Sequence, residues 1–143
     1  MVTNNNVKNN VIPFLIAKEK GIEVLYVSFG KTPLGETVYF KDETLILLND
    51  SLANKNKRYF VMAHELYHAL EHLEMSAYYT NQRHGKGKYE REANLFAGHL
   101  MIKLYQDVFG FLPESVQVLK DSYEVPIDLK DDLISLTRRV NKQ

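Results

Sequence analysis

The spacing of apolar residues changes along the chain from a pattern typical of strands to one typical of helices. Residues 22–27, 36–40 and 44–48 are short runs rich in β-branched and aromatic side chains, which predicts three strands. The second and third runs are separated only by three polar residues, so we expect them to form a hairpin. The sheet therefore belongs to the first third of the chain.

The remaining elements are expected to be helices. Residues 10–20 predict a first helix, with Pro13 in its first turn and Gly21 as its stop. After residue 58, apolar side chains recur every three or four positions, which predicts two long helices separated by a loop at about residues 74–88. Shorter helices are expected at residues 113–120 and 128–139. The pattern predicts an α+β fold in which a small three-stranded sheet packs on a helical bundle.

Composition limits the class of protein. The chain has 143 residues, 45% of them hydrophobic and 25% charged, which suits one globular domain over residues 11–143 behind a disordered polar tail at residues 1–10. Its net charge is zero, so direct binding to nucleic acid is unlikely on electrostatic grounds. There is no cysteine, no signal-peptide pattern and no run near the roughly twenty apolar residues of a membrane span. We therefore expect a cytoplasmic protein.

The most informative motif is His-Glu-x-x-His, formed by His64, Glu65 and His68 within the first long helix. Four residues advance a helix by about 6 Å and place the two histidines roughly 40° apart, so both imidazoles can bind one metal ion. Glu65 follows the first histidine and can take a proton from the water that the metal activates. This arrangement is typical of zinc metallopeptidases, and the helix would make the fold zincin-like.

The third ligand is expected from the second long helix. Glu90 lies on the same helical face as Ala93, Asn94 and Ala97, and the two small alanines allow this helix to lie close to the histidines. Asn94, one turn after Glu90, can accept a hydrogen bond from the outer nitrogen of a ligating histidine. Glu92 is the alternative ligand, but it points about 200° away from Glu90. We favour Glu90.

Several other side chains are candidates for supporting roles. His72 continues the histidine series but lies about 12 Å along the helix from His64, so it is expected beyond the ligands, near the helix end. Tyr78, Tyr79 and Tyr89 are candidates for contacts to the substrate or to its oxyanion. His84, in the basic loop between the long helices, is a candidate substrate contact.

These motifs together resemble one known family. The strand end Ile46-Leu-Leu-Asn49, the run from Arg58 to His72 containing the metal motif, and Glu90-Arg-Glu-Ala-Asn-Leu-Phe-Ala97 are similar to the ImmA/IrrE metallopeptidases. The resemblance covers residues 11–104. It implies a gluzincin-like Zn²⁺ site with His64, His68 and Glu90 as ligands and Glu65 as general base.

The resemblance also implies a biological role, and the chain departs from the family pattern at two positions. Members of the family are associated with phages and mobile elements, and cleave or antagonise helix-turn-helix transcriptional repressors, so a repressor is the expected protein partner. Tyr67 stands where glycine is usual, and is expected to narrow a substrate groove or pack under the sheet. Lys103 stands where proline is common. The alternative function is a non-catalytic module that binds the repressor around a structural or vestigial metal site.

Overall fold

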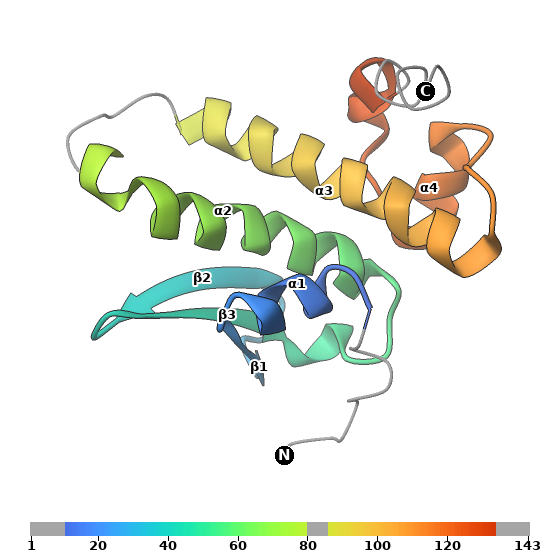
Figure 1. Ribbon diagram of the computed structural model, residues 1–143. Helices are drawn as coiled ribbons and strands as arrows, with labels where there is room; N and C mark the ends of the chain where they lie inside the picture. The colour runs from blue at the N-terminus through green and yellow to red at the C-terminus, as the bar shows by residue number, and fades with distance from the viewer. Residues whose placement is uncertain (1–10, 80–85, 134–143) are drawn as a thin grey trace.

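The computed structural model describes residues 11–79 and 86–133, with side chains described at residues 11–71 and 89–133. Figure 1 shows a sheet at one side of a long central helix and a second long helix at the other. The helices and strands are α1 (Phe14–Glu19), β1 (Glu23–Val27), β2 (Gly35–Phe40), β3 (Glu43–Asn49), α2 (Lys57–Tyr79), α3 (Lys86–Phe109) and α4 (Val116–Tyr123).

The sheet has the strand order β1-β3-β2. Val24 of β1 pairs in parallel with Ile46 of β3, and Thr37 of β2 pairs with the same residue in the antiparallel direction. The predicted hairpin of β2 and β3 is confirmed. Its loop consists of Lys41 and Asp42, whose φ angles of 47° and 67° are those of the tight two-residue turns that match the strand twist.

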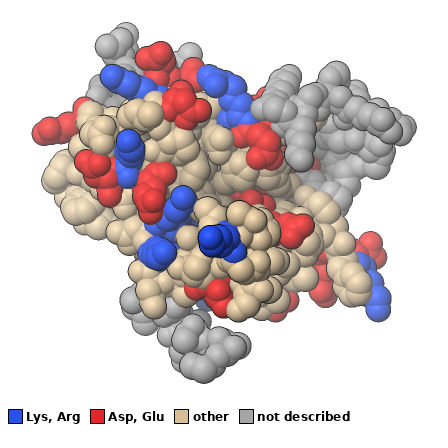
Figure 2. Space-filling model, turned by 180° about the vertical axis from the view of Figure 1, so that it is seen from behind, with Lys and Arg blue, Asp and Glu red and all other residues tan. Residues whose placement is uncertain are grey.

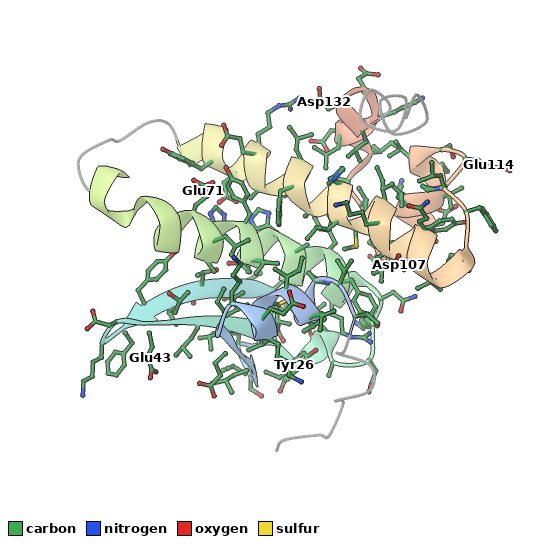
Figure 3. The ribbon with its side chains drawn as sticks, in the orientation of Figure 1. Tyr26, Glu43, Glu71, Asp107, Glu114 and Asp132 are labelled. Atoms are coloured by element: carbon green, nitrogen blue, oxygen red, sulfur yellow. The ribbon has the colours of Figure 1, made fainter. Side chains whose placement is uncertain are left out.

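Helix α2 lies between the sheet and α3, so it forms the middle layer of the molecule (Figure 1). Ile46 and Leu48 of β3 and Met62 and Leu66 of α2 are completely buried, and side chains fill the layer between helix and sheet (Figure 3). The predicted α+β fold, with a small three-stranded sheet packed on helices, is confirmed. The metal motif therefore lies on the central helix and has neighbours on both sides.

Small residues allow close packing on α3. Ala93 and Ala97 are completely buried where α3 lies against its neighbours. A Cβ atom on Gly98 would lie only 2.8 Å from Leu133 Cδ2, so the absence of a side chain here lets Leu133 of the last described segment pack directly on α3. Arg91 and Asp132 form an ion pair between the same two segments. The C-terminal part of the chain is thereby held against the helix that carries Glu90.

Asn49 fixes the loop that precedes β2. Its buried side chain donates hydrogen bonds to the carbonyl oxygens of Gly30 (2.9 Å) and Pro33 (3.0 Å), and its Oδ1 accepts one from Ser51 N (3.0 Å). These bonds satisfy backbone groups that the loop would otherwise bury without partners. The start of β2, at Gly35, is therefore held in a defined position beside α2.

The predicted ends of the long helices are wrong. Helix α2 continues to Tyr79 and α3 already begins at Lys86, so the two helices occupy most of the loop expected at residues 74–88. The segment at 74–79 contains no proline or glycine, so nothing in it stops the helix. At its other end, α3 extends to Phe109.

The shorter helices also begin later than predicted. Helix α1 begins at Phe14, directly after Pro13, and α4 occupies Val116–Tyr123, with Ser115 as its N-cap residue. After a short 3₁₀ turn, residues 130–133 are helical, and the rest of the predicted last helix lies outside the described residues. The predicted polar tail at residues 1–10 also lies outside them.

Candidate metal centre

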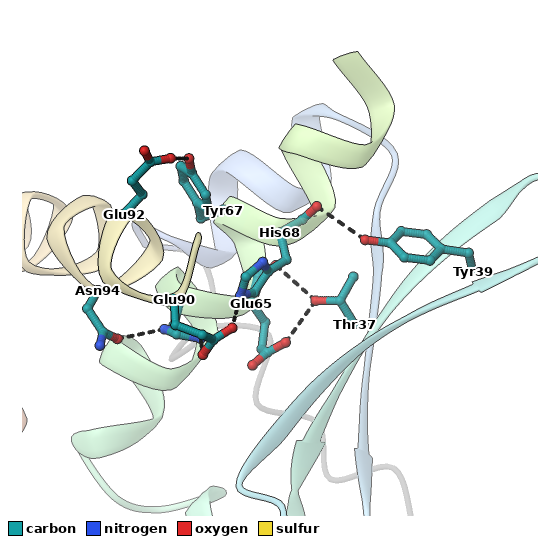
Figure 4. A network of polar contacts seen from close by, with 9 residues as sticks. Thr37, Tyr39, Glu65, Tyr67, His68, Glu90, Glu92 and Asn94 are labelled. Atoms are coloured by element: carbon teal, nitrogen blue, oxygen red, sulfur yellow. Dashed lines mark hydrogen bonds and ion pairs between the residues drawn. The ribbon is translucent and has the colours of Figure 1, made fainter. Parts of the chain in front are cut away.

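Three side chains from the two long helices meet at one point. His64 and His68 lie one turn apart on α2, with ring centroids separated by 5.0 Å. Glu90 extends toward them from α3, with Oε2 at 3.1 Å from His64 Nε2 and Oε1 at 2.9 Å from His68 Nε2 (Figure 4). The carboxylate therefore spans both imidazoles.

The hydrogen bond between His64 and Asn94 makes this arrangement suitable for a cation. His64 Nδ1 lies 2.7 Å from Asn94 Oδ1, and because an amide oxygen only accepts hydrogen bonds, Nδ1 must carry the proton (Figure 4). In a neutral ring, Nε2 then presents a lone pair to the Glu90 carboxylate 3.1 Å away. Two acceptors at that distance repel each other unless a proton or a metal ion lies between them.

The donor atoms also suit a metal in spacing and kind. The ligand atoms of His64, His68 and Glu90 all lie within 4.8 Å of one another. Donors around a tetrahedral zinc with bonds of about 2.0–2.1 Å lie roughly 3.3 Å apart, and the two histidine–carboxylate contacts, at 3.1 and 2.9 Å, are within a few tenths of an ångström of that spacing. Two imidazoles and one carboxylate also suit iron or manganese. The site therefore fits a divalent ion.

Glu92, the alternative third ligand, is held elsewhere. Its Oε2 accepts a 2.6 Å hydrogen bond from the Tyr67 hydroxyl, whose ring packs against Phe96 with centroids 5.5 Å apart. Tyr67 therefore packs against α3, and the expectation that it packs under the sheet is wrong. The wide apolar surface of α2 left the orientation of this residue undecided, and contacts with α3 determine it.

Glu65 lies on the side of the motif that faces β2. The hydroxyl hydrogen of Thr37 is shared between Glu65 Oε1 (2.9 Å) and the Glu65 backbone oxygen (3.0 Å) (Figure 4). Burial raises the pKa of Glu65, an effect that the Thr37 hydrogen bond and the neighbouring histidines oppose. Next to it, Tyr39 donates a hydrogen bond to the backbone oxygen of His68 at 3.2 Å. Strand β2 thus determines the position of the Glu65 carboxylate.

A cleft of about 360 Å³ opens beside His64 and Glu65. It lies between the first turns of α2, the start of β2 and the connection that follows α4. Its lining residues are Leu34, Gly35, Lys57, Phe60, Val61, His64, Glu65, Glu124 and Pro126. The cleft gives the candidate centre direct access from solvent along one side.

Thr37, Tyr39 and the cleft were not expected from the sequence. Thr37 and Tyr39 belong to a strand whose residues carry no motif, and their partners on α2 are 28 and 29 positions away. Of the predicted substrate contacts, Tyr89 is half-buried on α3 immediately before Glu90. The other candidates were His72, Tyr78, Tyr79 and His84. Their side chains lie outside the part of the chain whose side chains the structure describes.

The comparison with protein families agrees with this geometry. Residues 17–106 match the family model of peptidase M78, described as the IrrE N-terminal-like domain. The chain belongs to this family. The matched segment contains α2 and α3 as far as residue 106, so the peptidase M78 assignment covers the two histidines, Glu65 and Glu90. It supports a metallopeptidase-like domain whose substrate is a protein.

Two further findings stand beside this assignment. No curated protein matches the chain. Among residues 11–79 and 86–133, no helix is both long enough and apolar enough to cross a membrane.

Proposed function

We propose that this peptidase M78 domain is a zinc-dependent endopeptidase that cleaves a helix-turn-helix repressor. The observation that carries the proposal is the convergence of a two-histidine, one-glutamate cluster with a separate, buried carboxylate, Glu65, at one end of a cleft. A closed structural zinc site uses four protein ligands, whereas the three side chains here leave a position for a reactant.

In the proposed reaction, His64, His68 and Glu90 hold the zinc. The bound ion would act as a Lewis acid toward the attacking water and the scissile carbonyl. Glu65 accepts a proton from that water, and the raised pKa of its buried carboxylate favours this transfer. Glu65 then gives the proton to the leaving amine, while the hydrogen bond from Thr37 keeps the carboxylate in place.

The position of β2 supports an extended peptide as substrate. Strand β2 is at the edge of the sheet and runs beside α2, and among the described residues only β3 pairs with it. An edge strand offers free backbone donors and acceptors to an added peptide strand. A peptide bound there lies next to Glu65, because Thr37 on this strand contacts that carboxylate.

The repressor as substrate follows from the family resemblance. Charge distribution is consistent with a protein partner: on the face shown in Figure 2, acidic and basic side chains of the described residues are interspersed. The whole chain has a net charge of zero. Neither property creates the positive electrostatic field that attracts proteins to duplex DNA.

The test combines metal analysis with cleavage. The wild-type chain and Glu65→Gln are purified, their zinc content is measured, and each is incubated with a helix-turn-helix repressor encoded next to its gene. We expect one zinc per chain in both proteins and cleavage only by the wild type. Glutamine keeps the shape of the side chain but cannot accept the proton, so turnover should fall by at least about 100-fold.

Other outcomes contradict specific parts of the proposal. Cleavage by zinc-loaded Glu65→Gln would remove Glu65 from its role. If both proteins bind zinc and the repressor but neither cleaves it, the endopeptidase proposal fails and the non-catalytic binding module replaces it. Failure to bind zinc, with another divalent ion restoring cleavage, would change only the identity of the metal.

A further inference from the structure

The cleft beside Glu65 follows one face of α2. Its helical lining residues, Lys57, Phe60, Val61, His64 and Glu65, are spaced three and four positions apart, so they lie along a single side of the helix. From first to last they span about 12 Å, the length of three to four residues of extended peptide. The face that carries His64 and Glu65 is therefore also the floor of the cleft.

One part of the cleft is apolar. Phe60 and Val61 are only 7% and 8% exposed, and Leu34 adds a third apolar wall. A Cβ atom on Gly35 would lie 2.7 Å from Val61 Cγ1 and 3.0 Å from Glu65 Cγ, so β2 touches α2 at this point. The size of the side chain at position 61 consequently limits the depth of the cleft.

The outer end of the cleft is charged. Lys57 is partly exposed and Glu124 is exposed, so both lie toward solvent. Glu124 ends α4 in a left-handed conformation (φ 58°, ψ 38°) that side chains larger than asparagine seldom adopt. This turn buries Val125 completely and directs the chain so that Pro126 forms part of the wall.

We propose that the cleft is a specificity subsite that binds one large apolar side chain of the substrate, next to the scissile bond. The proposal rests on the proposed endopeptidase function, because it uses the position of Glu65 to define the scissile bond. The volume, about 360 Å³, is at the lower end of typical ligand pockets and suits one bulky side chain with its backbone. Lys57 and Glu124 flank the neighbouring residue of the peptide at the open end.

The test determines cleavage preference. The zinc-loaded full chain is incubated with a random peptide mixture, and the new ends are identified by mass spectrometry. We expect Leu, Met or Phe to be enriched at one fixed position beside the cleaved bond. Matched peptides carrying Leu, Phe or Ala at that position then give kcat/KM ratios, and zinc-loaded Glu65→Gln gives their binding affinities without cleavage.

Substitutions at position 61 should change the preference in opposite directions. Val61→Ala deepens the cleft and should shift the Phe-to-Leu ratio toward Phe by about 10-fold, whereas Val61→Ile should shift it toward Leu. Val116→Ala is the matched control, since Val116 is buried to a similar degree but does not line the cleft. It should leave the ratio unchanged, and thermal unfolding of all three variants shows whether any change comes from loss of fold.

The outcomes separate the two proposals. Cleavage without an apolar preference, or a preference that ignores both substitutions at position 61, overturns the subsite and leaves the endopeptidase intact. Absence of cleavage by the zinc-loaded wild type overturns the endopeptidase. If, in that case, peptide binding still depends on position 61, the cleft stands as a peptide-binding site of a non-catalytic module.

Discussion

The two sides of α2 at the metal centre obtain their partners in different ways. On the α3 side, His64 and His68 meet Glu90, and Asn94 supports His64, so helix contacts helix through side chains at regular spacings. On the β2 side, Glu65 meets a strand residue brought there by the packing of the sheet. The α3 side brings together donors that are compatible with a metal ion, and the β2 side orients a carboxylate. Substitutions on the two sides should therefore affect different measurements.

The largest effect is expected on the α3 side. His64→Ala removes a proposed ligand and leaves Glu90 with one imidazole, so zinc affinity should fall by at least about 100-fold and cleavage should be lost. Competition with a chromogenic chelator measures the affinity. Tight zinc binding by this variant would show that the α3 side does not form the metal site and would remove the contrast between the two sides.

A smaller effect, confined to turnover, is expected on the β2 side. Thr37→Val removes the hydroxyl that contacts Glu65 while keeping the shape of the side chain, so the carboxylate loses its fixed orientation. We expect kcat to fall by about 10-fold to 100-fold with KM and zinc affinity unchanged. Steady-state kinetics with the intact repressor as substrate measures kcat and KM.

Thr37→Ser is the control for this prediction. Serine keeps the hydroxyl and should retain most of the activity. A change in zinc affinity in Thr37→Val, or equal loss in both variants, would mean that Thr37 acts through general stability of the sheet and does not position Glu65.

The smallest effect is expected at Tyr67, on the α3 side but away from the ligands. Tyr67→Phe removes its hydrogen bond to Glu92 and should lower the free energy of unfolding by about 1 kcal/mol. Urea unfolding measures this loss, with Tyr39→Phe on the β2 side as the matched variant. Zinc affinity should not change. A marked change would show that Glu92 competes for the metal and would sharpen the distinction between the two glutamates.

Sequence periodicity predicted the contacts on the α3 side because the residues that make them are regularly spaced within single helices. The histidines share a face of one helix, and the small residues next to Glu90 identified the face of the other helix that approaches them. The hydrogen bond between Asn94 and His64 was expected for the same reason. Whether these side chains act as ligands remains a prediction, although their positions relative to one another agree with it.

The β2 side could not be predicted in this way. Thr37 reaches Glu65 only because β2 pairs with β3 in one register and the sheet then packs on α2, and neither step leaves a pattern in the sequence of β2. The cleft similarly combines Leu34, Val61 and Glu124, which are distant in the chain. The ends of the long helices were misjudged because residues 74–79 contain no stop signal, and three of them, Glu74, Met75 and Ala77, favour helix.

The sequence separation within the metal centre has a consequence for the lifetime of the protein. His64 and Glu90 are 26 residues apart, so an ion held by both acts as a cross-link between two antiparallel helices. Closing a loop of that length with a covalent bond would reduce the entropy of the unfolded chain by an amount worth about 3.5 kcal/mol. Reversible coordination makes this constraint depend on free metal concentration. The supply of zinc would then control how long the chain resists cellular proteases, in addition to controlling its own proposed peptidase activity.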